Sequence, residues 1–247
     1  MTFDKNQTVR EIAINNPATV RVFQTFGIDY CCGGKRPLHE ACASVNAPMD
    51  SVMEALDELD VNGISPEEVW TNSSLADLTA HIVGRHHRYV RDESPRIARL
   101  LQKVVERHGE AHPELGAIQD TFAALSQELF AHMIKEERIL FLFLETLETA
   151  VRAGRPAPLG CFASVELPIS RMLADHDDAG ALLAKMRELS GGYRAPEGSC
   201  PSYRGLYQAL EEFERDLHHH VHLENNILFP RAVEMERSLR ETAHVSH

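Results

Sequence analysis

The chain has 247 residues, which is long enough for one large domain or two unequal ones with a proper core. Its formal net charge of −12, with no basic stripe, argues against a nucleic-acid-binding surface. No apolar run approaches the roughly 20 residues that span a bilayer, so the sequence predicts no membrane anchor.

The residue counts bear on compartment and on metal content. The start of the chain, Met-Thr-Phe-Asp-Lys, has no apolar signal core, which predicts a cytoplasmic location. Five cysteines, with Cys31 and Cys32 adjacent, do not suit a disulfide framework and fit reduced cytosol better. Fourteen histidines are many for this length and are the first indication of a metal. The alternative is that they are surface residues, with His244 and His247 in the tail.

Residues 1–61 predict a small domain of several short helices. Helix starts are indicated at Thr8 (a capping box with Glu11), Asn16-Pro17, Pro37 and Pro48. Gly27 is placed to end the second of these helices. A module of this size has a modest core, and packing against a second copy in a homodimer is one way to complete it.

The rest of the chain predicts a helical bundle. Residues 62–73 carry glycine, proline and polar residues without helical periodicity, and are interpreted as a linker. Residues 74–247 then contain four long helical segments joined by short loops, over about 74–109, 113–153, 168–191 and 201–240. This pattern is typical of a four-helix up-down bundle. Pro95 lies inside the first segment and is expected to kink it. Strand patterns are absent, so the sequence predicts an all-α fold.

One ten-residue stretch occurs twice in the bundle. Residues 132–141 and 220–229 both read His-x-x-x-Glu-x-x-Ile-Leu-Phe. Residues four apart on an α-helix lie about 40° apart around its axis, so each histidine shares a face with its glutamate. Imidazole and carboxylate groups supplied twice from one face are what a bundle needs to hold two transition-metal ions. The pattern differs from Glu-x-x-His of ferritin-like proteins and from His-Glu-x-x-His of zinc proteases.

The other two helices offer further ligands. His176 lies in the third segment, and His86 or His87 lies at a similar depth in the first. His87 precedes His132 by 45 residues and His176 precedes His220 by 44, which favours His87 over His86. The bundle therefore resembles two copies of a helix pair. The candidate metal ligands are His87, His132, Glu136, His176, His220 and Glu224.

Some neighbouring residues compete with these candidates. Within the histidine run at 218–222, alignment with His132 selects His220, and His218 and His222 are expected to face solvent. The same register selects Glu136 over Glu137. An exposed histidine stripe is the alternative, but burial of six such groups without a metal would cost several kcal/mol. Four imidazoles with two carboxylates favour Fe, Mn or Zn.

The turn Asp-Tyr-Cys-Cys-Gly-Gly-Lys at 29–35 is the second chemical feature. Its glycines let the backbone approach a partner closely. Adjacent cysteines have poor geometry for a relaxed disulfide. Thiol redox or transient iron transfer by Cys31 and Cys32 is one interpretation, and buried small apolar packing is the other.

The cysteine turn, followed by a hemerythrin-like bundle with two His-x-x-x-Glu-x-x-Ile-Leu-Phe copies, resembles the repair of iron centres family. The resemblance covers nearly the whole chain. It implies a short N-terminal cysteine domain and a bundle with a non-haem di-iron centre, oxo- and carboxylate-bridged. It assigns the same six ligands, with Glu136 and Glu224 as bridges. The family's usual proline after the motif is present as Pro230 in the second copy, whereas the first copy continues with Leu142.

The function that this resemblance implies is repair of iron–sulfur clusters after nitrosative and oxidative damage. The route would be iron donation or removal of nitric oxide, with damaged iron–sulfur proteins as clients and nitric oxide or oxygen as small ligand. Cys31 and Cys32 would mediate thiol redox or iron transfer. Whether the protein is an enzyme stays open, because a nitric oxide reductase is one alternative. A hemerythrin-like oxygen or redox sensor is another, although oxygen-carrying hemerythrins use five histidines and this set has four.

Overall fold

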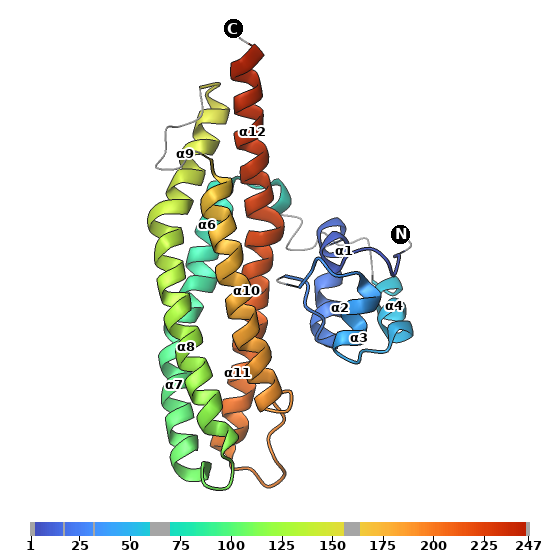
Figure 1. The fold of residues 1–247 in the computed structure, drawn as a ribbon, viewed down its shortest axis with the longest axis vertical. Helices are drawn as coiled ribbons and strands as arrows, with labels where there is room; N and C mark the ends of the chain where they lie inside the picture. The colour runs from blue at the N-terminus through green and yellow to red at the C-terminus, as the bar shows by residue number, and fades with distance from the viewer. Residues whose placement is uncertain (1–2, 17, 32, 60–69, 156–163, 246–247) are drawn as a thin grey trace. The chain divides into compact units, whose positions relative to one another are not determined.

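A computed structural model of the protein describes all residues except 1–2, 17, 32, 60–69, 156–163 and 246–247. Within the described part the regular structure is helical, with one isolated bridge between Thr8 and Pro37, which confirms the all-α prediction (Figure 1). Most of the predicted linker lies outside the described residues. The chain divides into two compact units, one of residues 1–79, 144–166 and 218–247, the other of residues 80–143 and 167–217.

The first unit begins with four short helices: α1 Val9–Asn15, α2 Thr19–Phe26, α3 Leu38–Ser44 and α4 Met49–Asp57. The predicted capping box is present, because Thr8 Oγ1 accepts from the Glu11 amide at 3.1 Å and the Glu11 carboxylate accepts from the Thr8 amide at 2.9 Å. Gly27 ends α2 with a φ of 68°, as predicted. The predicted start of α2 at Asn16-Pro17 is early, because Asn16 ends α1.

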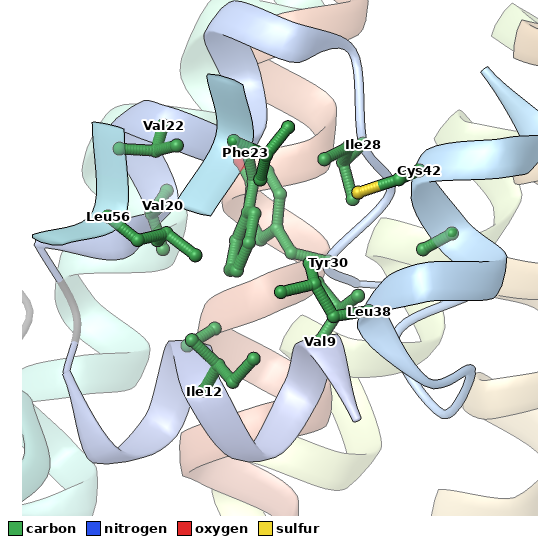
Figure 2. Packing of buried hydrophobic residues seen from close by; sticks show 13 residues of the cluster. Val9, Ile12, Val20, Val22, Phe23, Ile28, Tyr30, Leu38, Cys42 and Leu56 are labelled. Carbon is green, nitrogen blue, oxygen red and sulfur yellow. The ribbon is translucent and has the colours of Figure 1, made fainter. Parts of the chain in front are cut away.

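These four helices enclose a hydrophobic core of their own (Figure 2). Phe23 and Tyr30 are fully buried in it, with stacked rings whose centroids lie 6.4 Å apart. Aliphatic and thiol side chains surround them: Val9, Ile12, Val20, Val22, Ile28, Leu38, Cys42, Val52 and Leu56. Burial of this apolar surface is the main stabilising term for the short helices, which would be marginal in isolation.

The long segments of the bundle are helical as predicted. Their elements are α6 Leu75–His81, η1 Ile82–His87 and α7 Arg88–His108; α8 Glu114–Lys135, η2 Glu136–Leu140 and α9 Phe141–Arg152; α10 Glu166–Leu189; and α11 Pro201–His222, η3 Leu223–Leu228 and α12 Phe229–Val245. Helices α7 and α8 run side by side (Figure 1). Pro95 lies inside α7, which continues past it. Among the described helices none is both long and apolar enough to cross a membrane.

Three of the long segments contain a π-helical turn, and each turn carries a predicted metal ligand. His87 is the last residue of η1, Glu136 is the first of η2, and Glu224 lies in η3. A π turn shifts the register of the residues that follow it and is frequent at functional sites. The fourth predicted ligand-bearing segment, α10 with His176, is an uninterrupted α-helix.

A buried glutamate closes the start of α6. Glu148 on α9 is 6% exposed, and its carboxylate accepts hydrogen bonds from the amides of Leu75 at 2.9 Å and Ala76 at 3.2 Å. The first amides of a helix have no partner within the helix and favour a negative charge. Glu148 therefore acts as a cap supplied from a distant part of the chain.

The start of α10 is closed in the same way. Glu236 on α12 is 6% exposed and accepts from the Val165 amide at 3.0 Å and from the Ser164 hydroxyl at 2.7 Å. Each capping glutamate follows its motif glutamate by twelve residues, Glu148 after Glu136 and Glu236 after Glu224. The internal repeat therefore includes this cap as well as the ligand motif.

We expect Glu236→Ala to lower the free energy of unfolding by about 1–2 kcal/mol, because it removes the acceptor for buried helix-start donors. Chemical denaturation followed by circular dichroism measures the change. Glu234→Ala on the same helix is the matched control. Glu234 is exposed and paired with Arg237 at the surface, a contact worth about 0–1 kcal/mol. Equal losses in the two variants would contradict the capping role.

Candidate metal centre

Imidazole nitrogens and carboxylate oxygens converge where the predicted ligands lie. His132 Nε2 lies 3.1 Å from His176 Nε2 and 3.2 Å from Glu136 Oε1. His87 Nε2 lies 3.4 Å from Glu136 Oε2. All four side chains are buried, at most 4% exposed. Three helical segments thus bring polar groups together in a place shielded from water.

The outer nitrogens of two of these histidines are held by carboxylates. His87 Nδ1 lies 2.6 Å from Glu137 Oε1, and His132 Nδ1 lies 3.3 Å from Asp175 Oδ2. An ionised carboxylate only accepts hydrogen bonds, so each Nδ1 carries the hydrogen and each Nε2 presents its lone pair. A metal-ligating histidine has this arrangement in most protein sites.

Both supporting carboxylates are held in the ionised form. Burial raises the pKa of Glu137, but hydrogen bonds from His87 and Arg91 outweigh burial, so its pKa is lower than usual. Burial likewise raises the pKa of Asp175, and hydrogen bonds led by that from Lys135 outweigh it. At neutral pH the two groups therefore remain acceptors for the histidines.

The inner atoms fit a metal ion. Nε2 lone pairs that point at a carboxylate oxygen and at another imidazole nitrogen repel one another where water does not screen them. A proton on His132 Nε2 can form a hydrogen bond to only one of its two neighbours, Glu136 Oε1 or His176 Nε2, at a time. A cation with imidazole and carboxylate ligands satisfies all of them, and this donor set suits Fe, Mn or Zn.

The remaining predicted ligands also lie close to one another. His220 Nε2 is 2.9 Å from Glu224 Oε1, and both side chains are buried. Among the described residues, ligand atoms that all lie within 4.8 Å of one another form two sets: His87, Glu136, His220 and Glu224; and His132, Glu136, His176 and Glu224. Together these sets contain the six residues predicted from the sequence, and both glutamates occur in each set.

The neighbouring candidates have other contacts. His86 is buried and its Nδ1 lies 3.1 Å from Asp216 Oδ2, so it is turned toward α11 and belongs to neither set. His87 belongs to one of the sets. Glu137, adjacent to Glu136, holds the outer nitrogen of His87 instead of joining a set.

The prediction that His222 faces solvent is wrong. His222 is 0% exposed, its Nδ1 accepts from Asn226 Nδ2 at 2.7 Å, and its ring lies edge-on to Tyr30 with centroids 5.4 Å apart. Burial, reinforced by nearby positive groups, lowers the pKa of His222 to about 3, so its imidazole is neutral. His218 is half-buried. The partner of His222 comes from residue 30, which helical periodicity around residue 222 cannot reveal.

Asp29 organises the cysteine turn. Its Oδ1 accepts from the Cys31 amide at 2.9 Å and from Cys31 Sγ at 3.2 Å, and its Oδ2 accepts from the Gly33 amide at 2.8 Å. Cys31 is buried, with 5% of its surface exposed. Cys32, the other predicted cysteine, lies outside the described residues.

The backbone of this turn is bonded to the π turn η3 within the same compact unit. Asn226 Nδ2 donates to the Tyr30 carbonyl at 3.0 Å, and Arg10 Nη2 donates to the Asn225 carbonyl at 2.8 Å. Gly34 has no room for a side chain, because a Cβ would lie 2.7 Å from the Tyr30 carbonyl oxygen. The sequence therefore needs glycine at this position for the turn to pack.

Sequence reasoning missed the supporting carboxylates Glu137 and Asp175. Each is the direct neighbour of a predicted ligand, Glu136 or His176. Adjacent residues lie about 100° apart around a helix, so a ligand's neighbour faces an adjoining helix and can reach the outer nitrogen of a histidine there. An acidic residue next to a ligand is the only sequence signal, and it is weak.

Known proteins resemble this chain over nearly its full length. The hemerythrin HHE cation binding domain matches residues 78–232, and a domain of unknown function (DUF542) matches residues 5–60. The iron-sulfur cluster repair protein YtfE of Pectobacterium atrosepticum is 34% identical over 232 residues, which is 94% of this chain and 99% of that protein. The protein of the same name from Yersinia pseudotuberculosis is 33% identical with the same coverage. The matched segments include both motif copies and the cysteine turn.

We expect Glu137→Gln to weaken metal binding by about 10–100-fold, because the loss of the carboxylate weakens its hold on His87 Nδ1. Competition with a chromophoric chelator, using Fe(II) under anaerobic conditions, measures the affinity. Glu128→Gln, an exposed change on the neighbouring helix α8, should leave the affinity unchanged. Wild-type affinity in Glu137→Gln would show that this carboxylate does not support the site.

Proposed function

We propose that this chain, which belongs to the family of iron–sulfur cluster repair proteins and carries the hemerythrin HHE cation binding domain, restores damaged iron–sulfur clusters with a di-iron centre. The observation that carries the proposal is the pair of ligand sets that share Glu136 and Glu224. Two adjacent ions require carboxylates that both ions can reach, and Glu136 and Glu224 each belong to both sets.

The ligand assignment follows the two sets. His87 and His220 would hold one iron, His132 and His176 the other, and Glu136 and Glu224 would bridge. The predicted oxo bridge would complete the pair. When bound, two irons supply one-electron redox chemistry and a store of exchangeable metal. The chain's own part is to fix the imidazoles through Glu137 and Asp175 and to exclude water around them.

The domain division that we propose is an N-terminal cysteine domain over 1–61, a linker over 62–73 and the bundle over 74–247. Cys31 and Cys32 would mediate thiol redox or pass iron to a client protein with a damaged cluster. Support comes from the hydrogen bond between the Tyr30 carbonyl and Asn226, because it joins the cysteine turn to the segment that follows Glu224. Nitric oxide or oxygen as small ligand, a cytoplasmic location and a homodimer complete the proposal.

Of the two routes to repair, we favour iron donation. A thiol turn bonded to a ligand-bearing segment suits movement of metal between thiolates and the bundle, since thiolates bind iron well. Removal of nitric oxide needs no such turn. Steady consumption of nitric oxide with an electron donor, without iron loss, would favour the reductase instead. Reversible oxygen binding would favour a sensor.

We expect two irons per chain in the protein purified anaerobically, and loss of most of the iron in Glu136→Ala and in Glu224→Ala, because each removes a ligand common to both sets. Metal analysis with absorption spectroscopy measures both. Glu128→Ala is the control and should keep two irons. Zinc alone, without the absorption of an oxo-bridged ferric pair, would contradict a di-iron centre.

We expect Cys31→Ser and Cys32→Ser to keep two irons per chain but to slow cluster recovery in a damaged client, because neither residue is among the proposed ligands. The measurement is the return of client activity with time, beside iron content. Cys200→Ser, a free thiol at the start of α11, is the control. Unchanged recovery rates in both cysteine variants would remove the thiols from the mechanism.

A further inference from the structure

A cavity that includes none of the six proposed metal ligands lies in the first compact unit. It has a volume of about 260 Å³ and is lined in part by Arg10 from α1, Arg231 from α12, and His222 and Asn226 from the fourth segment. Apolar side chains form most of the remaining wall, and no aspartate or glutamate is among the described lining residues. The cavity therefore has two basic residues and no acidic residue among its described lining residues, and is otherwise mostly apolar.

The two guanidinium groups are half-buried and bonded to neutral partners. Arg10 donates to the Asn225 carbonyl at 2.8 Å. Arg231 donates to the carbonyls of Trp70 at 2.8 Å and Ser73 at 2.5 Å. In the part of the chain that the structure describes, neither arginine forms an ion pair with a carboxylate. A guanidinium has five N–H donors, so both retain donors for a further acceptor.

Partial burial disfavours the charged form of both arginines. It lowers the pKa of Arg10, and it lowers the pKa of Arg231 despite an opposing influence of Glu148. Taking a charge out of water is costly unless an opposite charge or several hydrogen bonds replace the water. An anion in the cavity would supply the missing compensation.

We propose that this cavity binds a small oxyanion, a phosphate or carboxylate group, between the guanidinium groups of Arg10 and Arg231. Planar guanidinium forks match the oxygens of these groups, and charge-assisted hydrogen bonds are the strong ones. The volume lies below the 300–1,000 Å³ of typical drug-sized sites, so the ligand is a small ion or a short ester. The bound oxyanion links α1 to α12 and strengthens the contact of the cysteine turn with η3.

The test is a titration of the full-length, iron-loaded protein with inorganic phosphate and, separately, with acetate, followed by isothermal calorimetry. We expect saturable binding of one oxyanion at the cavity. Arg10→Gln and Arg231→Gln should each weaken it about tenfold or more, the equivalent of one charge-assisted contact. Arg237→Gln is the matched control, since Arg237 lies on α12 but is exposed and paired with Glu234. The probe that binds with the higher affinity shows whether the cavity prefers a phosphate or a carboxylate group.

Phosphate can also bind to a metal centre, and the variants separate the two sites. Equal binding in the wild type, Arg10→Gln and Arg231→Gln places the anion elsewhere and overturns the proposal. Absence of saturable binding of both probes overturns it as well. Circular dichroism checks folding, because Arg231→Gln also removes bonds to two carbonyls. If Arg231→Gln is unfolded, Arg10→Gln and Arg231→Lys test the proposal instead. Lysine keeps the positive charge but lacks the planar pair of N–H donors of arginine.

Discussion

The convergence of imidazole nitrogens and carboxylate oxygens away from water is the constraint on which the structure depends. His132 Nε2 meets Glu136 and His176 at about 3 Å, in a place that bulk solvent does not reach. Groups of this kind repel one another unless a cation lies among them. This arrangement is unfavourable without a metal, yet several features hold it. They are the carboxylates that accept from the Nδ1 atoms, the glutamates that cap α6 and α10, and the π turns. A folded chain that keeps them there is built for a metal.

The two halves of the bundle use the same plan but have diverged beside the ligands. In the first copy, the residue after the motif glutamate is Glu137, which supports His87. In the second copy, the corresponding Asn225 offers its carbonyl to Arg10, and Asn226 bonds the Tyr30 carbonyl. The first copy therefore uses the residue after its motif glutamate to support a ligand, whereas the second copy uses Asn226, one residue further on, to hold the cysteine turn. The two copies thus differ in the contacts that they make directly after the motif glutamate.

Sequence reasoning was strongest where periodicity and local caps decide the structure. It predicted the all-α fold, the capping box at Thr8 and Glu11, the end of α2 at Gly27, and six residues that lie together in two sets. It missed the π turns, because they depend on packing against other helices rather than on the composition of their own segment. It placed His222 in solvent for a related reason. The ring of Tyr30 covers His222, and no local pattern links residues so far apart along the chain.

Burial of the thiol sets a condition on the proposed transfer of iron. A client can exchange metal only with a sulfur that it can reach, and Cys31 is 5% exposed, with its Sγ bonded to Asp29. The turn must therefore open before a client engages it. One side-chain hydrogen bond, from Asn226 to the Tyr30 carbonyl, joins it to η3, and a bond of this kind contributes about 1 kcal/mol. Exposure of Cys31 Sγ would also break its bond to Asp29. Arg10 lines the cavity, and its amide donates to the Gly34 carbonyl of the turn. A bound oxyanion beside Arg10 would therefore oppose opening of the turn and limit access to the thiol.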